Sequence, residues 1–140
     1  MGKLLVSKKY LGQTVKMQEG KEYTVFRHIT NHRFPESSST AIFIVSFKFA
    51  RLSHNANRIA SILPMLLITG LPGFNCKMYS MNKSNGYWQG MYQWQSKQAL
   101  EEYKKSFVFR MMNKRVIKGT LRSIELENQN LADFLSINLI

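Results

Sequence analysis

The fold is decided by residues Leu71–Ser96, which read LPGFNCKMYSMNKSNGYWQGMYQWQS. The Asn85-Gly86 pair near the middle is the strongest short hairpin signal in the chain, because both residue types tolerate the positive φ that a tight turn needs. The residues on either side of this pair suit extended strands, in which successive side chains point to opposite faces. The stretch therefore predicts a strand over Phe74–Met81, a tight turn, and a second strand over Tyr87–Gln95.

The second of these strands concentrates its large rings on one face. That face carries Trp88, Gly90, Tyr92 and Trp94. A glycine inside a strand often marks a place where another group approaches the backbone closely. We therefore expect the Gly90 face to line a pocket, and the alternative is plain core packing in which a helix side chain fills the gap over Gly90.

The segment before this hairpin supplies another strand and a helix. Residues Ala41–Ala50 alternate as a strand that is apolar on both faces, with Phe43 on one and Ile44 on the other. Such a strand must be covered on both faces. Ser53 or Asn55 can cap a following helix, whose apolar residues recur at helical spacing before it ends at Gly70.

The segment after the hairpin repeats this pattern. Ser96 is a good N-cap for a second helix, which ends before Gly119. Its buried stripe is expected to be Leu100, Tyr103, Phe107 and Met111. A fourth strand is expected over Thr120–Glu127, with Ile124 facing inward. The resulting order, β-α-β-β-α-β, is the ferredoxin-like arrangement of an α+β fold.

Three segments follow from this order. Residues 1–40 form an N-terminal arm with one strand over Lys21–Ile29, residues 41–127 form the ferredoxin-like domain, and residues 128–140 form an apolar tail that docks on it. Two helices cover one face of such a sheet and leave the other bare. We expect the same face of a second copy to cover it, which gives a homodimer and a dimeric α/β barrel.

Composition restricts the class of protein further. The formal net charge is +12, and no acidic residue occurs from Ser37 to Leu100. This charge would attract anions, but no recognised nucleic-acid motif clusters it on one element, so a basic surface is the simpler interpretation. The single cysteine, Cys76, has no disulfide partner, and no export signal or membrane span is visible. We expect a cytoplasmic protein.

Three segments resemble those of a known family. Leu71-Pro-Gly-Phe-Asn-Cys-Lys-Met-Tyr, Gly86-Tyr-Trp-Gln-Gly-Met-Tyr-Gln-Trp and Ser96-Lys-Gln-Ala-Leu-Glu-Glu-Tyr together resemble the monooxygenase-like proteins of the dimeric α/β-barrel superfamily. The resemblance covers Ala41–Glu127. It implies a ferredoxin-like fold, while the superfamily includes cofactor-independent oxygenases, haem-handling enzymes, decarboxylases and ligand sensors, so the fold does not fix the function.

Conventional catalytic motifs are missing from the sequence. It has no glycine-rich phosphate loop, no cysteine pair and no nucleophile elbow, and the spacing of His28 and His32 does not suit a metal pair across a strand and a loop. We therefore expect no metal and no cofactor. An apolar pocket suits a small hydrophobic or aromatic ligand. Met78, Trp88, Gly90, Tyr92 and Trp94 are the expected ligand-binding residues.

An oxygenase without a cofactor requires a substrate that itself supplies electrons to oxygen. His54 or Tyr79 is the candidate proton acceptor or hydrogen-bond partner for such a substrate. A non-catalytic ligand-binding dimer is the main alternative. A single-stranded RNA-binding module is a weaker one, because Phe43 and Tyr87 fall where RNA-recognition domains stack bases but the neighbouring residues break both motifs.

Overall fold

The computed structural model describes residues 4–17, 20–31, 41–48, 68, 70–82 and 84–139. Within them lie seven strands, β1 (Leu4–Val6), β2 (Thr14–Lys16), β3 (Glu22–Asn31), β4 (Ala41–Phe47), β5 (Phe74–Met81), β6 (Trp88–Trp94) and β7 (Arg122–Glu127). The same residues contain three helices, α3 (Lys97–Lys104), α4 (Phe107–Lys114) and α5 (Leu131–Asn138).

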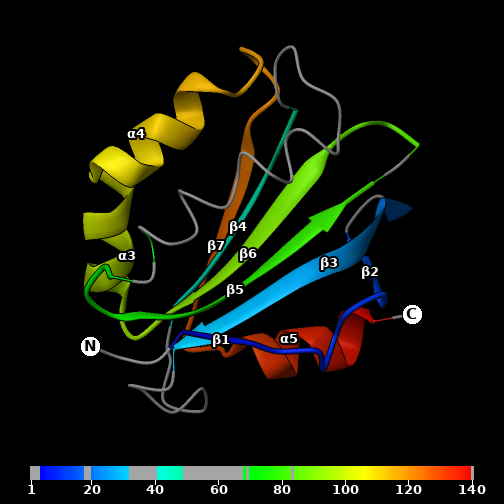
Figure 1. Cartoon of the computed structure of the whole chain (residues 1–140), viewed down its shortest axis with the longest axis horizontal. Coiled ribbons are helices and arrows are strands. Elements are labelled where there is room, and N and C mark those ends of the chain that lie inside the picture. Colours follow the sequence, from blue (N-terminus) through cyan, green and yellow to red (C-terminus); the bar gives the residue numbers. More distant parts are fainter. Residues whose placement is uncertain are drawn as a thin grey trace.

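The strands form one antiparallel sheet in the order β1-β3-β5-β6-β4-β7, with β2 also paired to β3. The four strands β5-β6-β4-β7 have the spatial order of the ferredoxin-like fold, so the predicted fold class is confirmed. Figure 1 shows α3 and α4 together on one side of the curled sheet, with α5 away from them. The core is therefore divided into two clusters, one on each face of the sheet.

The hairpin lies where the sequence predicts it, but its connection, residues 82–87, is longer than the tight turn expected at Asn85-Gly86, and Asn85 does not have positive φ. Strand β5 begins at Phe74 and ends at Met81, and β6 is one residue shorter at each end than expected. Gly86 has φ +77°, in the region that favours glycine, and the Asn82 amide donates to the Tyr87 carbonyl at 2.8 Å. The turn therefore fixes the register that places β5 beside β6.

Both faces of β4 are buried, as its sequence requires. Phe43 packs in the cluster under α3 and α4, whereas Ile42 and Ile44 pack in the other cluster against Leu131 and Leu135 of α5. The expected docking of the C-terminal tail thus occurs as a helix. Because the chain covers this face itself, the argument for a second copy loses its premise, and homodimerisation stays a prediction.

The second helix differs from the prediction. It is broken after Lys104, and Ser106 begins a new helix because its Oγ accepts a hydrogen bond from the Phe109 amide at 3.3 Å. The break changes the phase of the buried stripe, so that Val108 and Met112 are buried in α4. Phe107, which was expected in the core, is 52% exposed. The expectation of one continuous stripe was wrong.

The remaining expectations concern the two edges of the sheet. Ile124 of β7 was expected to face inward but is 41% exposed, whereas Leu126, which was expected on the same face, is partly buried against the cluster of α5. At the other edge, β3 lies between β1 and β5. Most of the helix expected before Gly70 lies outside the described residues, although Ile68 is helical and buried.

Helix α5 should contribute much of the stability of the fold, and one pair of variants tests this. Leu135→Ala should lower the free energy of unfolding by about 2–5 kcal/mol, because Leu135 is fully buried against the sheet. Ile137→Ala is the matched control, since Ile137 lies on the same helix but is 83% exposed. Urea unfolding measures both. Equal, small effects of the two variants would contradict the docking of α5.

Candidate functional site

A cavity of about 40 Å³ lies between the sheet and the two helices α3 and α4. This volume holds a few water molecules. Most of the described wall residues are aromatic or apolar, and two of them, Lys77 and Arg115, are cationic. The described wall residues are Phe47, Ile68, Lys77, Tyr79, Trp88, Gln89, Gly90, Tyr92, Tyr103, Val108, Met112 and Arg115. The cavity therefore combines an apolar surface with positive charge.

The rings of the wall are held by one another. The Tyr103 hydroxyl donates to the Tyr92 hydroxyl at 3.1 Å, and the Tyr92 hydroxyl lies 3.8 Å from Sδ of Met112. Trp88 contacts Phe26 edge to face, with ring centroids 5.0 Å apart. These contacts join residues of two strands, β3 and β6, with residues of the helices α3 and α4, and they give the wall a defined shape.

The tyrosine hydroxyls stay protonated at neutral pH. Burial raises the pKa of Tyr79 and of Tyr92, with the neighbouring tyrosine as the next cause in each case. Burial likewise raises the pKa of Tyr103. A buried hydroxyl of this kind can donate a hydrogen bond but is a poor proton acceptor. Tyr79 is thus suited to the hydrogen-bonding part of its predicted role.

Lys77 is the most unusual group in the cavity. Its Nζ lies 4.1 Å from the centroid of the Tyr79 ring and 4.3 Å from that of Tyr92, so the ammonium sits against two π-faces. Burial, followed by the positive charge of Arg27, lowers the pKa of Lys77 to about 7. The amine is therefore close to half protonated at neutral pH.

Gly90 makes room for this arrangement. It pairs with Tyr79 across β5 and β6, while Lys77 pairs with Tyr92. A Cβ added at Gly90 would lie 2.9 Å from Cε1 of Tyr92 and 3.2 Å from Cε of Lys77. The space over Gly90 is thus filled by a ring and a lysine tail from the wall itself.

The residues selected from the sequence fall in different places. Tyr79, Trp88, Gly90 and Tyr92 line the cavity. Trp94 lies in the same core cluster, stacked on Tyr103 with ring centroids 4.8 Å apart, but does not line it.

Two selected residues lie elsewhere. Met78 points to the opposite face of the sheet, where it packs in the cluster of α5, because neighbouring strand residues face opposite ways. His54 lies outside the described residues.

Sequence reasoning missed Lys77, Tyr103 and Arg115. Lys77 could have been found, because the alternation of β5 places Lys77 and Tyr79 on one face and excludes Met78 from it. Tyr103 was assigned only to the core. Arg115 could not have been placed, since its position depends on the break between α3 and α4.

Other kinds of site find no support in the described part of the chain. Its residues contain no group of three or more potential metal ligands. Cys76 is buried on the α5 face, and His28 is buried there beside the ring of Tyr10. None of the described helices is long and apolar enough to cross a membrane.

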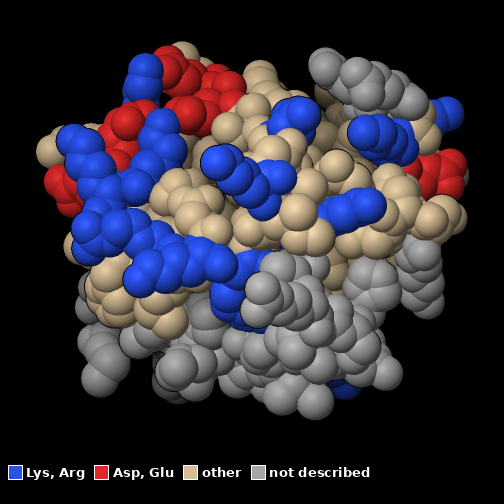
Figure 2. Space-filling model, turned by 90° about the horizontal axis from the view of Figure 1, so that it is seen from above, with Lys and Arg blue, Asp and Glu red and all other residues tan. Residues whose placement is uncertain are grey.

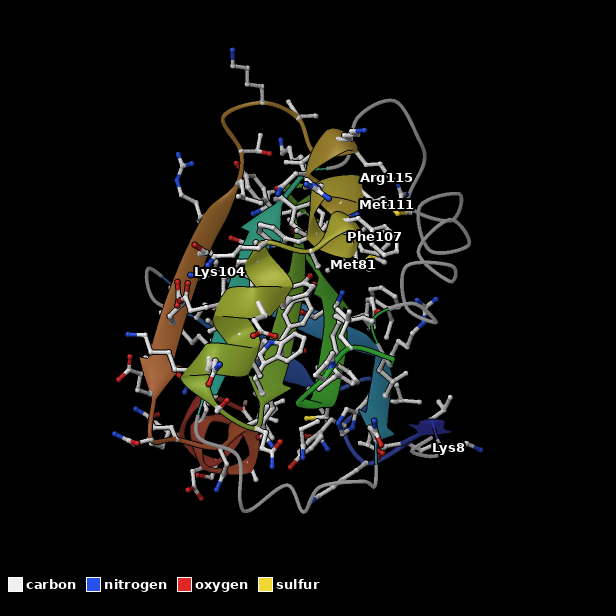
Figure 3. The ribbon with its side chains drawn as sticks, turned by 90° about the vertical axis from the view of Figure 1, so that its left-hand side faces the viewer. Lys8, Met81, Lys104, Phe107, Met111 and Arg115 are labelled. Carbon is white, nitrogen blue, oxygen red and sulfur yellow. The ribbon has the colours of Figure 1, made fainter. Side chains whose placement is uncertain are left out.

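The basic surface is separate from the cavity wall. Figure 2 shows many Lys and Arg side chains spread over the face seen from above, with the acidic side chains gathered near its margins. In Figure 3, Phe107, Met111 and Arg115 lie along one side of α4, whereas Lys104 extends from α3 on another side. Lys104 is ion-paired with Glu101 and Glu125. Lys77 and Arg115 are thus distinguished from the surface charges by their place in the cavity.

Solved structures with this fold are found at low sequence identity. A heme-degrading enzyme from Listeria monocytogenes is 10% identical, with a TM-score of 0.61 over 90% of this chain and 97% of that one. A ferredoxin-fold protein related to antibiotic biosynthesis monooxygenases, from the same species, is 13% identical, with a TM-score of 0.59 over 82% and 69%.

An anthrone oxidase-like protein is 15% identical, with a TM-score of 0.58 over 79% of this chain, which spans only 55% of that protein. No protein-family model and no curated protein sequence matches the chain. The likeness to these structures shows the fold that the sequence resemblance implied, a ferredoxin-like fold shared with monooxygenase-like proteins.

Gly90→Val tests how tightly the wall is packed. The new side chain should displace the ring of Tyr92 and the tail of Lys77, and should lower the free energy of unfolding by about 1–3 kcal/mol. In a Tyr92→Leu background, Gly90→Val should lower the free energy of unfolding by less, because the Tyr92 ring that lies closest to the new Cβ is absent. Denaturant unfolding of the four proteins measures the difference. An equal cost in both backgrounds would show that Tyr92 does not limit the space.

Proposed function

We propose that the cavity binds a small hydrophobic or aromatic ligand. The observation that supports this most strongly is the set of rings from Tyr79, Trp88 and Tyr92 around a glycine, in a cavity whose wall is otherwise mostly apolar. Ligand pockets usually combine such a wall with a few polar groups that fix orientation. Trp94 lies outside the wall and stacks on the ring of Tyr103, which is part of it.

The size of the cavity limits how a ligand enters. A cavity that binds benzene has a volume of about 150 Å³, and the present cavity has about 40 Å³. A whole ring therefore requires side chains of the wall to move. Met112 is the best candidate, because an unbranched thioether changes rotamer easily and its sulfur makes a long contact of 3.8 Å with the Tyr92 hydroxyl.

A monooxygenase-like reaction is the chemistry that we propose for this site. An anthrone-type substrate carries an acidic CH₂ group across the central ring from a carbonyl and conjugated with it through the flanking aromatic rings. Loss of a proton gives an enolate, which supplies the electrons to O₂. One oxygen atom ends in the new carbonyl and the other in water, so the reaction balances without a cofactor. Tyr79 would donate a hydrogen bond to the developing oxyanion, and His54 remains the proton acceptor suggested by sequence.

Two alternatives compete with this reaction. A non-catalytic ligand-binding protein, as a homodimer or a monomer, would use the same cavity. RNA binding is disfavoured, because Phe43, which would have to stack on a base, is buried under α3 and α4. We keep the cytoplasm as the expected location.

Ligand binding is tested by filling the cavity. The wild-type protein should bind indole, a neutral ring, with shifts of the Trp88 and Gly90 resonances in NMR titrations. Val108→Phe should abolish these shifts, because Val108 is a buried wall residue. Phe107→Ala is the matched control on the same helix, since Phe107 is largely exposed and lies outside the wall. Indole binding that survives Val108→Phe would place the ligand elsewhere.

Oxygen chemistry is tested with anthrone as substrate. We expect the protein to accelerate oxygen uptake, with one O₂ consumed for each carbonyl formed. Tyr79→Phe should lower the rate about tenfold through loss of one hydrogen bond. Tyr87→Phe is the control, because Tyr87 lies outside the cavity wall. If oxygen uptake does not exceed the rate without protein, the proposed oxygen chemistry is wrong and only the ligand-binding role remains.

A further inference from the structure

Lys77 brings a positive charge into an aromatic wall without an anion to balance it. Among the described residues, no hydrogen-bond acceptor or carboxylate is within reach of its Nζ, which rests on the rings of Tyr79 and Tyr92. Lys77 is partly buried, and removing a charge from water is costly unless the charge is paired. The two π-faces compensate only part of this cost.

Two further basic side chains lie near Lys77 or in the same wall. Arg27 on β3 acts on Lys77 with the same sign, and Arg115 at the end of α4 also lines the cavity. No Asp or Glu occurs among the described wall residues. The carboxylates of Glu101, Glu125 and Glu127 are engaged with lysines on α3.

We propose that the ligand of this cavity is an aromatic anion, a carboxylate or a phenolate, whose charged group pairs with the Lys77 ammonium. The inference rests on the proposed function, because it specifies the chemistry of the same ligand. The charged group takes the existing space beside Lys77, and the ring enters the aromatic wall beside it when side chains such as Met112 move. Arg115 gives the anion a second positive charge from the opposite side of the sheet–helix interface.

Binding of an anion should be coupled to protonation of Lys77. Lys77 faces Tyr79 and Tyr92 and is influenced by the charge of Arg27 on β3. The other titratable groups among the described wall residues are Tyr103 from α3 and Arg115 after α4. The arginines stay charged and the tyrosines stay neutral between pH 6 and 9, because burial raises the tyrosine pKa values. Lys77 is thus the group in this set that titrates in that range.

The sign of the effect follows from this coupling. Below pH 7 the amine already carries its proton, and an anion binds at full strength. Above pH 7 the free protein loses the proton, since the pKa of Lys77 is about 7. The anion must then bind with uptake of a proton, so affinity should fall about tenfold per pH unit until the pKa of the complex is reached.

The experiment compares matched anionic and neutral probes by calorimetry at constant ionic strength. The pairs are benzoate with benzamide and 4-nitrophenolate with 4-nitroanisole. The wild-type protein should bind at least one anion about ten- to a hundredfold more tightly than its neutral partner. For benzoate, which stays ionised from pH 6 to 9, affinity should decline above pH 7, whereas benzamide affinity should not change.

Three variants assign the effect to Lys77. Lys77→Met should remove the preference for the anion and the pH dependence while keeping benzamide binding, which also shows that the variant folds. Lys77→Arg should keep the preference but lose the pH dependence, because a guanidinium does not titrate in this range. Lys97→Met is the matched control, since Lys97 is exposed and paired with Glu127. It should behave as wild type, although it also lowers the net charge by one.

The outcomes separate the inference from the function on which it rests. Equal binding of anionic and neutral probes would overturn the anionic ligand and leave the hydrophobic cavity standing. If Lys77→Met retains the preference for anionic probes, or if Lys97→Met removes it, the preference comes from the general positive charge of the protein. Either result would also overturn the inference. Failure of all four probes to bind would overturn both proposals.

Discussion

The structure depends on covering the two central strands, β4 and β6, on both faces. Their side chains are almost all buried, so apolar groups must be supplied from both sides of one sheet. Helices α3 and α4 supply one side, and α5 supplies the other. The cavity lies between the sheet and the first of these covers. Gly90 is part of its wall, and the space over this glycine is filled by Tyr92 and Lys77 of the sheet.

The cavity has a chemical character that differs from the basic surface around it. Surface lysines such as Lys104 meet carboxylates and water, so their charge is readily balanced. Lys77 instead meets two ring faces, and burial, followed by the positive charge of Arg27, lowers the pKa of its amine to about 7. A group that is cationic or neutral near pH 7 is suited to discriminate ligands by charge, which an aromatic wall alone does not do.

The errors of the sequence-based interpretation have a common physical cause. Phe107 and Met111 fit one helical stripe only while the helix is continuous, and one side-chain cap at Ser106 was enough to rotate the register. The sequence analysis expected the tail to dock but did not place it on the open face, which α5 covers, so homodimerisation stays a prediction without its original argument. Met78 was grouped with the pocket despite the alternation of its own strand. In each case the interpretation relied on a pattern in a short stretch of sequence, whereas the actual position of the residue depends on its contacts in the folded chain.

The sequence by itself determined the hairpin, the strands, their order and the ring-bearing face of β6, because turn preferences and period-two alternation act between residues close in the chain. It also determined that Tyr79, Trp88, Gly90 and Tyr92 share a neighbourhood, since strands joined by a tight turn must pair. Only the tertiary structure decided that α5 closes the second face and that Lys77 lies between two tyrosine rings. Those features depend on register and packing between distant segments, and the electrostatic environment of a buried amine is set by everything packed around it.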